Sequence, residues 1–219
     1  MPYSFPMHRK LAAATVLALT FGGVMYGAQA ATEAQYQAAF RHFSAAEHDN
    51  AEIKQAYQAF DSLRAAEPGD PVLLAYTGAA HAWMATTATD PMASLGLVDD
   101  GVAQIEKALA MLKPVHDAPS YGGDPASLLV RFTAANTFLS LPEAFHKGPR
   151  GARLLDDAIR SPAFAKASPA FQANLLMRAA TQARQSKRTE QARQYAQAVI
   201  SNKLPQAGEA QALLKQLGH

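Results

Sequence analysis

Two pairs of adjacent carboxylates are the residues of this sequence that most resemble catalytic groups. Asp99-Asp100 and Asp156-Asp157 have the composition of an acid/base pair such as glycoside cleavage uses. Both pairs fall on or near the start of expected helices, where one acid commonly complements the positive end of the helix and the other is solvated. We therefore favour a structural role for both pairs.

The histidines and glycines offer no stronger sign of catalysis. The sequence contains neither an H-E-x-x-H nor a G-x-S-x-G motif, and no cysteine that could complete a zinc site. Gly122-Gly123 lacks the strand–turn–helix setting of a phosphate loop. A metal site built across loops from His116, Asp117 and His146 is the remaining alternative. We predict a protein that is not an enzyme and that holds no metal or cofactor.

Two individual side chains could contact a ligand. Trp83, the only tryptophan, stands two residues after His81 and could form an aromatic wall, although a bulky residue on a buried helix face gives the same pattern. Arg131 lies within an apolar helical segment. It could anchor an anionic ligand, but we favour an internal ion pair with Asp156 or Asp157 of the next helix.

An export signal precedes the elements that position these residues. Residues 1–30 combine the basic Arg9 and Lys10, an apolar core over 11–25 and a small-x-small cleavage site at Ala28-Gln29-Ala30. A retained membrane anchor is the less favoured alternative, because the apolar core is shorter than the ~20 residues that span a bilayer. The segment predicts cleavage and a periplasmic or secreted protein with no stable membrane insertion.

The charge balance argues against a nucleic-acid partner. The chain has 20 Lys and Arg and 18 Asp and Glu, and the signal contains two of the basic residues and no acid, so 18 of each remain after cleavage. Nucleic-acid binders normally show a basic stripe. The sequence has one local basic cluster, near a helix end, made of Arg184, Lys187, Arg188 and Arg193.

Apolar residues beyond the signal recur at intervals of three and four, which is typical of amphipathic helices. Residues 51–66 show this pattern at Ile53, Ala56, Phe60 and Leu63. No segment shows the period-two alternation of strands. The sequence predicts one all-α domain over 31–219, with about nine helices. The expected ranges are 33–47, 51–66, 72–87, 97–112, 126–139, 150–160, 169–185, 189–200 and 207–217.

Small and large residues recur at fixed offsets in two places. These residues are Ala56, Phe60 and Pro68, and then Ala192, Ala196 and Leu204. Such offsets suit helix pairs that cross closely and stack on neighbouring pairs. They resemble the tetratricopeptide repeat family over most of 33–204, with a good match in those two units. The resemblance implies a solenoid of antiparallel helix pairs whose first helices line a concave surface.

The resemblance also implies a binding site on that surface. Its candidate residues, with Arg131 added as a separate anchor, are Arg41, His48, Trp83, Arg131, Met177, Thr181 and Arg184. None of the comparable positions supplies the lysine–asparagine pair with which family members grip a peptide C-terminus. The groove is therefore expected to carry little charge and to be rather apolar.

Exported proteins similar to this family commonly act as scaffolds, so the expected function is protein–protein interaction in the cell envelope. The partner would be another protein, or a segment of one, docked along the groove. The alternative is a partner of a transport system that traps a small ligand, with Trp83 and Arg131 near the site. Fold alone does not decide between the two.

Overall fold

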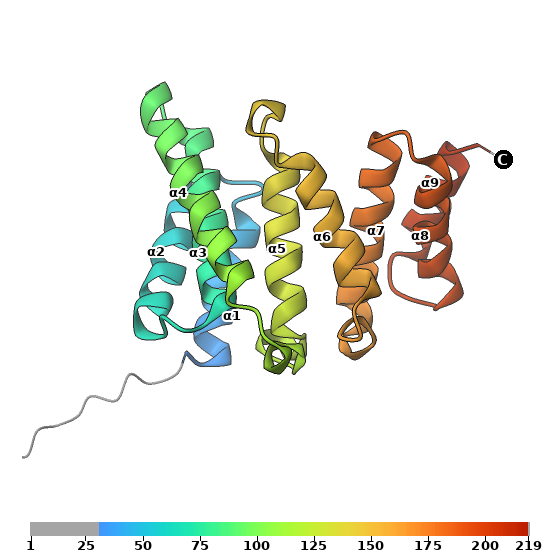
Figure 1. The fold of residues 1–219 in the computed structure, drawn as a ribbon, viewed down its shortest axis with the longest axis horizontal. Coiled ribbons are helices and arrows are strands. Elements are labelled where there is room, and N and C mark those ends of the chain that lie inside the picture. Colours follow the sequence, from blue (N-terminus) through green and yellow to red (C-terminus); the bar gives the residue numbers. More distant parts are fainter. Residues whose placement is uncertain (1–30, 219) are drawn as a thin grey trace, which may run out of the picture.

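The computed structural model describes residues 31–218, and this part of the chain is all-helical, as predicted (Figure 1). The predicted export signal, residues 1–30, lies outside the described residues, as does residue 219. No strand occurs between residues 31 and 218, where one isolated bridge joins Pro119 and Pro125. The α-helices of this part are α1 (Glu33–Ala45), α2 (Ala51–Ala66), α3 (Pro71–Met84), α4 (Pro91–Ala110), α5 (Ala126–Ser140), α6 (Gly148–Arg160), α7 (Pro169–Gln185), α8 (Thr189–Ser201) and α9 (Ala207–Gln216).

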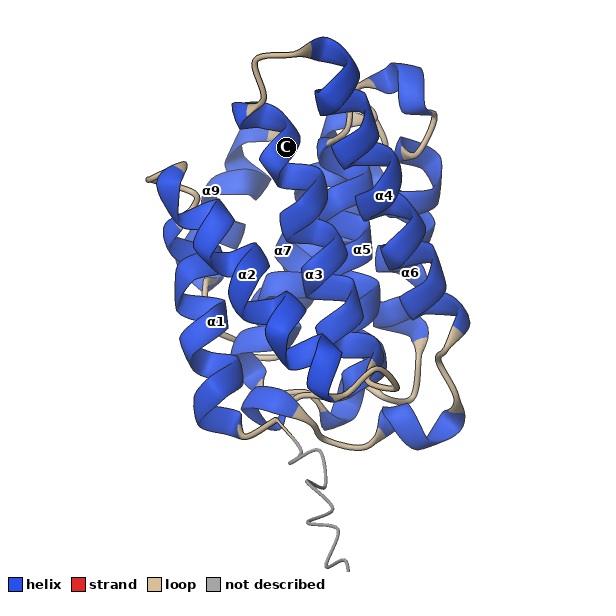
Figure 2. Ribbon diagram, turned by 90° about the vertical axis from the view of Figure 1, so that its left-hand side faces the viewer, coloured by secondary structure: helices blue, strands red, loops and turns tan. Residues whose placement is uncertain are grey.

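Helices α1 to α4 lie together at one end of the molecule, and α5, α6 and α7 follow, with α8 and α9 at the other end (Figure 1). Figure 2 views this row from the α1–α4 end. Each helix packs against the next one along the chain, and α3 also packs against α5. Helices α3 and α4 cross closely, because Gly78 and Gly101 face each other there without side chains.

Helix α4 begins at Pro91, six residues before the expected start at residue 97. Asp90 caps this helix, since its carboxylate accepts the backbone N–H groups of Met92 and Ala93 at 3.3 and 3.0 Å. The acid pair Asp99-Asp100 therefore lies on the exposed side of the helix interior. Its expected place in the first turn, as a partner of the helix dipole, is wrong.

Asp70 performs the same capping role for α3 and also ties a distant loop to it. Its Oδ1 accepts the N–H groups of Val72 and Leu73 at 2.7 and 3.2 Å, while the Tyr121 hydroxyl donates to Oδ2 at 2.8 Å. One carboxylate thus fixes the start of α3 and the turn before α5.

Replacing this carboxylate should cost more than replacing an ordinary cap. We expect Asp70→Ala to lower the free energy of unfolding by about 2 kcal/mol, because a cap and a long-range hydrogen bond are both lost. Asp90→Ala is the matched control and should cost about 1 kcal/mol, since Asp90 is exposed and only caps. Urea titration of both variants measures the difference; equal losses would contradict the role of Tyr121.

An aromatic cluster forms the core at the α1 end of the molecule. The rings of Tyr36 and Tyr121 stack with their centroids 4.3 Å apart, and those of Phe60 and Tyr76 stack at 4.9 Å. Tyr36 also meets the edges of Phe60 and Tyr76. Phe60 is completely buried and the three tyrosines nearly so. The cluster joins α1, α2, α3 and the turn before α5 into one unit.

The buried tyrosines make the fold sensitive to alkali. Burial raises the pKa of Tyr36, Tyr76 and Tyr121 above the usual value, and the nearby Asp70 adds to the rise in the pKa of Tyr121. The folded chain therefore keeps phenol protons that the unfolded chain releases above about pH 10.

We expect full stability below about pH 10 and a loss above it of up to about 1.4 kcal/mol per pH unit for each of these phenols. Urea unfolding at a series of pH values measures how steeply the free energy of unfolding falls with pH. Tyr121→Phe removes one of the three phenols and should make this fall less steep by up to about 1.4 kcal/mol per pH unit. Stability that stays level through this range would contradict the burial of the three hydroxyls.

Candidate functional site

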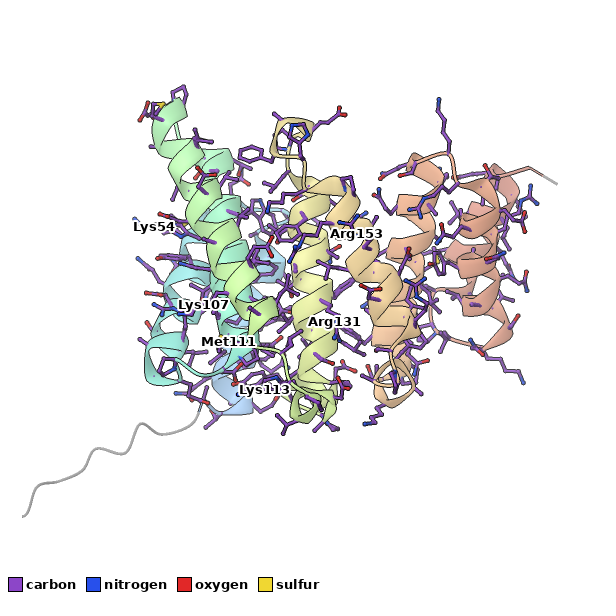
Figure 3. The ribbon with its side chains drawn as sticks, in the orientation of Figure 1. Lys54, Lys107, Met111, Lys113, Arg131 and Arg153 are labelled. Carbon is purple, nitrogen blue, oxygen red and sulfur yellow. The ribbon has the colours of Figure 1, made fainter. Side chains whose placement is uncertain are left out.

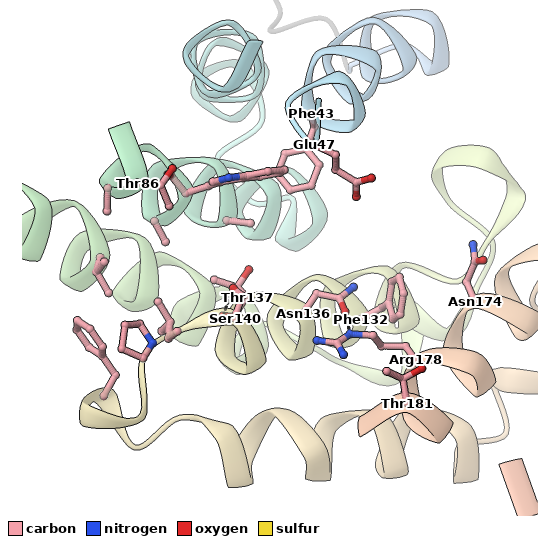
Figure 4. Close-up of a pocket in the computed structure, with 18 of the residues that line it drawn as sticks. Phe43, Glu47, Thr86, Phe132, Asn136, Thr137, Ser140, Asn174, Arg178 and Thr181 are labelled. Atoms are coloured by element: carbon pink, nitrogen blue, oxygen red, sulfur yellow. Dashed lines mark hydrogen bonds between the residues drawn. The ribbon is translucent and has the colours of Figure 1, made fainter. Parts of the chain in front are cut away.

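A large cavity of about 1130 Å³ lies between the odd-numbered helices (Figure 4). Side chains of α1, α3, α5, α7 and α9 line it, together with the first turns of α4 and the turn over 143–145. Its larger side chains are Phe43, Glu47, Trp83, Leu95, Phe132, Leu141, Phe145, Met177, Arg178 and Glu209.

A second hollow of about 340 Å³ continues this cavity toward Tyr36 and Tyr121. The two share the lining residues Phe43, Glu47, Phe132, Asn136, Thr137 and Asn174. They form one continuous feature, which we call the groove. Several lining side chains at its mouth, among them Leu95, Ser140 and Asn174, are exposed, so the groove is open to solvent.

Helical spacing explains which residues of α7 reach the groove. Asn174, Met177, Arg178 and Thr181 line it and recur at intervals of three and four, so they share one helix face. The opposite side of α7 buries small and aliphatic residues in the core, namely Ala173, Leu175, Leu176, Ala179, Ala180 and Ala183. The amphipathic pattern of α7 therefore sends its polar residues into the groove.

Aromatic side chains form the wall of the groove on the side of α1 and α3. Trp83 meets Phe43 edge to face, with the ring centroids 5.5 Å apart. Both rings are half-buried and line the cavity. A wall of this kind offers a flat apolar surface to a ligand.

A cation faces this wall across the groove. Nε of Arg178 donates to Oδ1 of Asn136 on α5 at 2.7 Å (Figure 4). Burial lowers the pKa of the Arg178 guanidinium from its ordinary value. Arg178 takes part in none of the ion pairs found within residues 31–218. Three acids line the groove: Glu47 and Glu209 are exposed, and Asp124, in the second hollow, is buried and accepts the Ser168 backbone N–H at 2.7 Å.

The structure brings together three of the seven site residues expected from the sequence. Trp83, Met177 and Thr181 line the groove. The other residues proposed from the family resemblance, Arg41, His48 and Arg184, are exposed and lie outside the lining of both hollows. Arg184 instead donates from Nη1 to Oε1 of Gln216 at 2.6 Å.

Arg131 on α5 (Figure 3) does not line the groove, and the ion pair expected for it is wrong. Asp156 and Asp157 were the expected partners of Arg131. Within the described chain Asp157 pairs with Arg160 instead, and Asp156 accepts a hydrogen bond from the Tyr195 hydroxyl at 2.6 Å. Nη1 of Arg131 is buried and has no hydrogen-bond partner among residues 31–218. The two acids turn toward their own helix and α8, away from α5.

The sequence did not point to Arg178 and Asn136. For Arg178 a usable signal was present, because this arginine recurs with Asn174 and Thr181 on the polar face of an otherwise apolar helix. No sequence signal identified Asn136 as its partner, since the two residues are 42 positions apart.

No group of three or more metal-ligating side chains comes together within the described part of the chain. Two side chains of the loop alternative have other partners: Nδ1 of His116 accepts the Lys113 N–H at 2.9 Å, and the Ser127 hydroxyl donates to Oδ1 of Asp117 at 2.5 Å. Between residues 31 and 218, none of the helices has the length and apolar character needed to cross a membrane.

No family model, curated protein or solved structure matches this chain.

Proposed function

We propose that this chain is an exported, non-catalytic binding protein that holds an organic ligand in the groove. The observation that carries the proposal is the presence, in one large cavity, of an aromatic wall and of the cation Arg178, which forms no ion pair with another residue of 31–218. Sites for small organic molecules are typically concave and apolar, with a few polar groups that orient the ligand. The groove has this composition. The protein would act in the cell envelope as a ligand-trapping partner of a transport system.

A tetratricopeptide-like arrangement is part of this proposal. Its support is that the first helix of each consecutive pair contributes to the groove. The close crossing at Gly78 and Gly101 adds to it, since small residues allow such crossings in helical repeats.

A second candidate is a scaffold that docks a segment of another protein along the same groove. The length of the groove favours it, because the second hollow extends the cavity toward α1 and the loop before α5. Exposed apolar residues at the start of α4 also favour it, since Met92 is 73 % exposed and Leu95, on the groove's rim, 43 % exposed.

One experiment separates the two occupants. The mature protein is purified from its native envelope with a photo-crosslinking amino acid at Met177 in the groove, or at the exposed Gln185 of the same helix as a control. Mass spectrometry then identifies the adducts. A small molecule attached at position 177 but not at 185 would support the trap, and a polypeptide attached there would support the scaffold. Equal adducts at both positions would contradict the groove as the site.

A further inference from the structure

The chemical class of the ligand follows from the donors that the groove leaves unused. A guanidinium carries five N–H donors and no acceptor. Only Nε of Arg178 has a hydrogen-bond partner among residues 31–218, the Asn136 side chain. The atoms Nη1 and Nη2 have no such partner, and neither of them is fully buried. They face the groove that Arg178 lines.

Asn136 adds further donors at the same place. Since its Oδ1 accepts the Arg178 hydrogen bond, its amide nitrogen presents two N–H groups, and these have no partner within the described residues. Thr181 lies beside Arg178 in the lining of the groove (Figure 4). The centre of the groove therefore presents the Nη donors of Arg178 and the amide donors of Asn136, none of which bonds to an acceptor among residues 31–218.

The rest of the lining is suited to an apolar body. Phe132 on α5 is close to the Arg178–Asn136 pair (Figure 4), and Trp83 lies on the opposite wall with Phe43. Glu47 lies on the side of Phe43, away from Arg178 (Figure 4). Of the three lining acids, Glu47 and Glu209 are exposed to water, so the repulsion they exert on an anion at Arg178 is screened. The third, Asp124, is buried in the second hollow, where its carboxylate accepts the backbone N–H and the hydroxyl of Ser168 at 2.7 and 3.3 Å.

We propose that the groove selects an apolar monocarboxylate. The carboxylate accepts hydrogen bonds from the Nη atoms of Arg178 and the amide of Asn136, and the apolar chain lies against Phe132 and Trp83. The planar fork of a guanidinium matches the two oxygens of a carboxylate, and charge-assisted bonds of this kind are about twice as strong as neutral ones. This inference rests on the proposed function, because it names the ligand class of the same groove.

Three ten-carbon probes whose head groups are anionic, neutral and cationic test the proposal. Decanoate, decanol and decylammonium are titrated into the full mature protein, and binding is measured by calorimetry and by the emission of Trp83. The chain's only tryptophan lines the groove, so its emission reports binding there. We expect decanoate to bind at least about tenfold more tightly than decanol, and decylammonium most weakly.

Variants assign the preference to Arg178. Arg178→Gln should weaken decanoate about tenfold and leave decanol unchanged, while Arg178→Lys should keep part of the preference because it keeps the charge. Arg153→Gln removes an exposed arginine of α6 outside the groove and is the matched control (Figure 3). Circular dichroism melting shows whether each variant is folded.

The outcomes separate the inference from the proposed function. Equal affinities for decanoate and decanol, or an unchanged preference in Arg178→Gln, would overturn the carboxylate inference and leave the groove as an apolar binding site. If none of the three probes changes the heat or the Trp83 emission, both the inference and the small-ligand function are contradicted.

Discussion

Gly101→Leu should disrupt the α3–α4 crossing and lower the free energy of unfolding by about 3 kcal/mol or more. A Cβ atom at residue 101 would lie 2.5 Å from the carbonyl oxygen of Gly78 and 2.6 Å from the backbone nitrogen of Ala82. These are backbone atoms, so no side-chain rotation relieves the clash and the two helices must separate. Thermal and urea unfolding measure the loss.

The same helix supplies the control for this prediction. Gly96 also lies on α4, but a Cβ there would meet no atom within 4 Å. Gly96→Ala should therefore raise stability by up to about 1 kcal/mol, because alanine favours the helix over glycine. A loss in Gly96→Ala as large as that in Gly101→Leu would contradict the close crossing as the cause.

The crossing also matters for the groove. Helix α3 carries Trp83, and the first turns of α4 carry Leu95, so both sides of the crossing contribute lining residues. If Gly101→Leu remains folded at low temperature, we expect weaker binding of decanoate together with a shifted Trp83 emission. A folded variant with unchanged affinity would show that the groove tolerates movement of α4.

Phe60→Ala should have an effect of about 4 kcal/mol, in the range measured for large-to-small substitutions in cores. Phe60 is completely buried, and its ring contacts those of Tyr36, Phe43 and Tyr76. Removing it leaves a cavity between α1, α2 and α3 that these large rings cannot easily fill. Urea unfolding measures the change, and a loss of this size is a large fraction of the 5–15 kcal/mol typical of a domain.

Two further variants separate cavity formation from loss of apolar surface. Phe60→Leu keeps most of the volume and should cost less than about 2 kcal/mol. Met92→Ala removes a large apolar side chain that is 73 % exposed, and it should change stability by no more than about 0.5 kcal/mol. If Phe60→Ala costs as little as Met92→Ala, the aromatic cluster does not support the fold.

The sequence by itself determined the secondary structure. The intervals of three and four placed Ile53, Ala56 and Phe60 on one face of a helix over 51–66. The structure has α2 with the same bounds, and these three residues are the ones it buries. Such spacing is a local property, because a helix must bury its apolar face whatever it packs against. The start of α4 was missed even though its signal is local. Asp90-Pro91 is a cap followed by a first-turn proline, a pattern that is typical of a helix start.

Only the tertiary structure decided which polar residues share a site. Arg131 and Arg178 are both arginines on helices with buried apolar faces, and the sequence favoured Arg131. The rotation of each helix about its axis is set by packing against its neighbours, and that rotation places Arg178 and Asn136, but not Arg131, in the groove. Periodicity identifies the face of a helix that must be buried, whereas the partner of a residue on another helix depends on contacts between segments far apart in the chain.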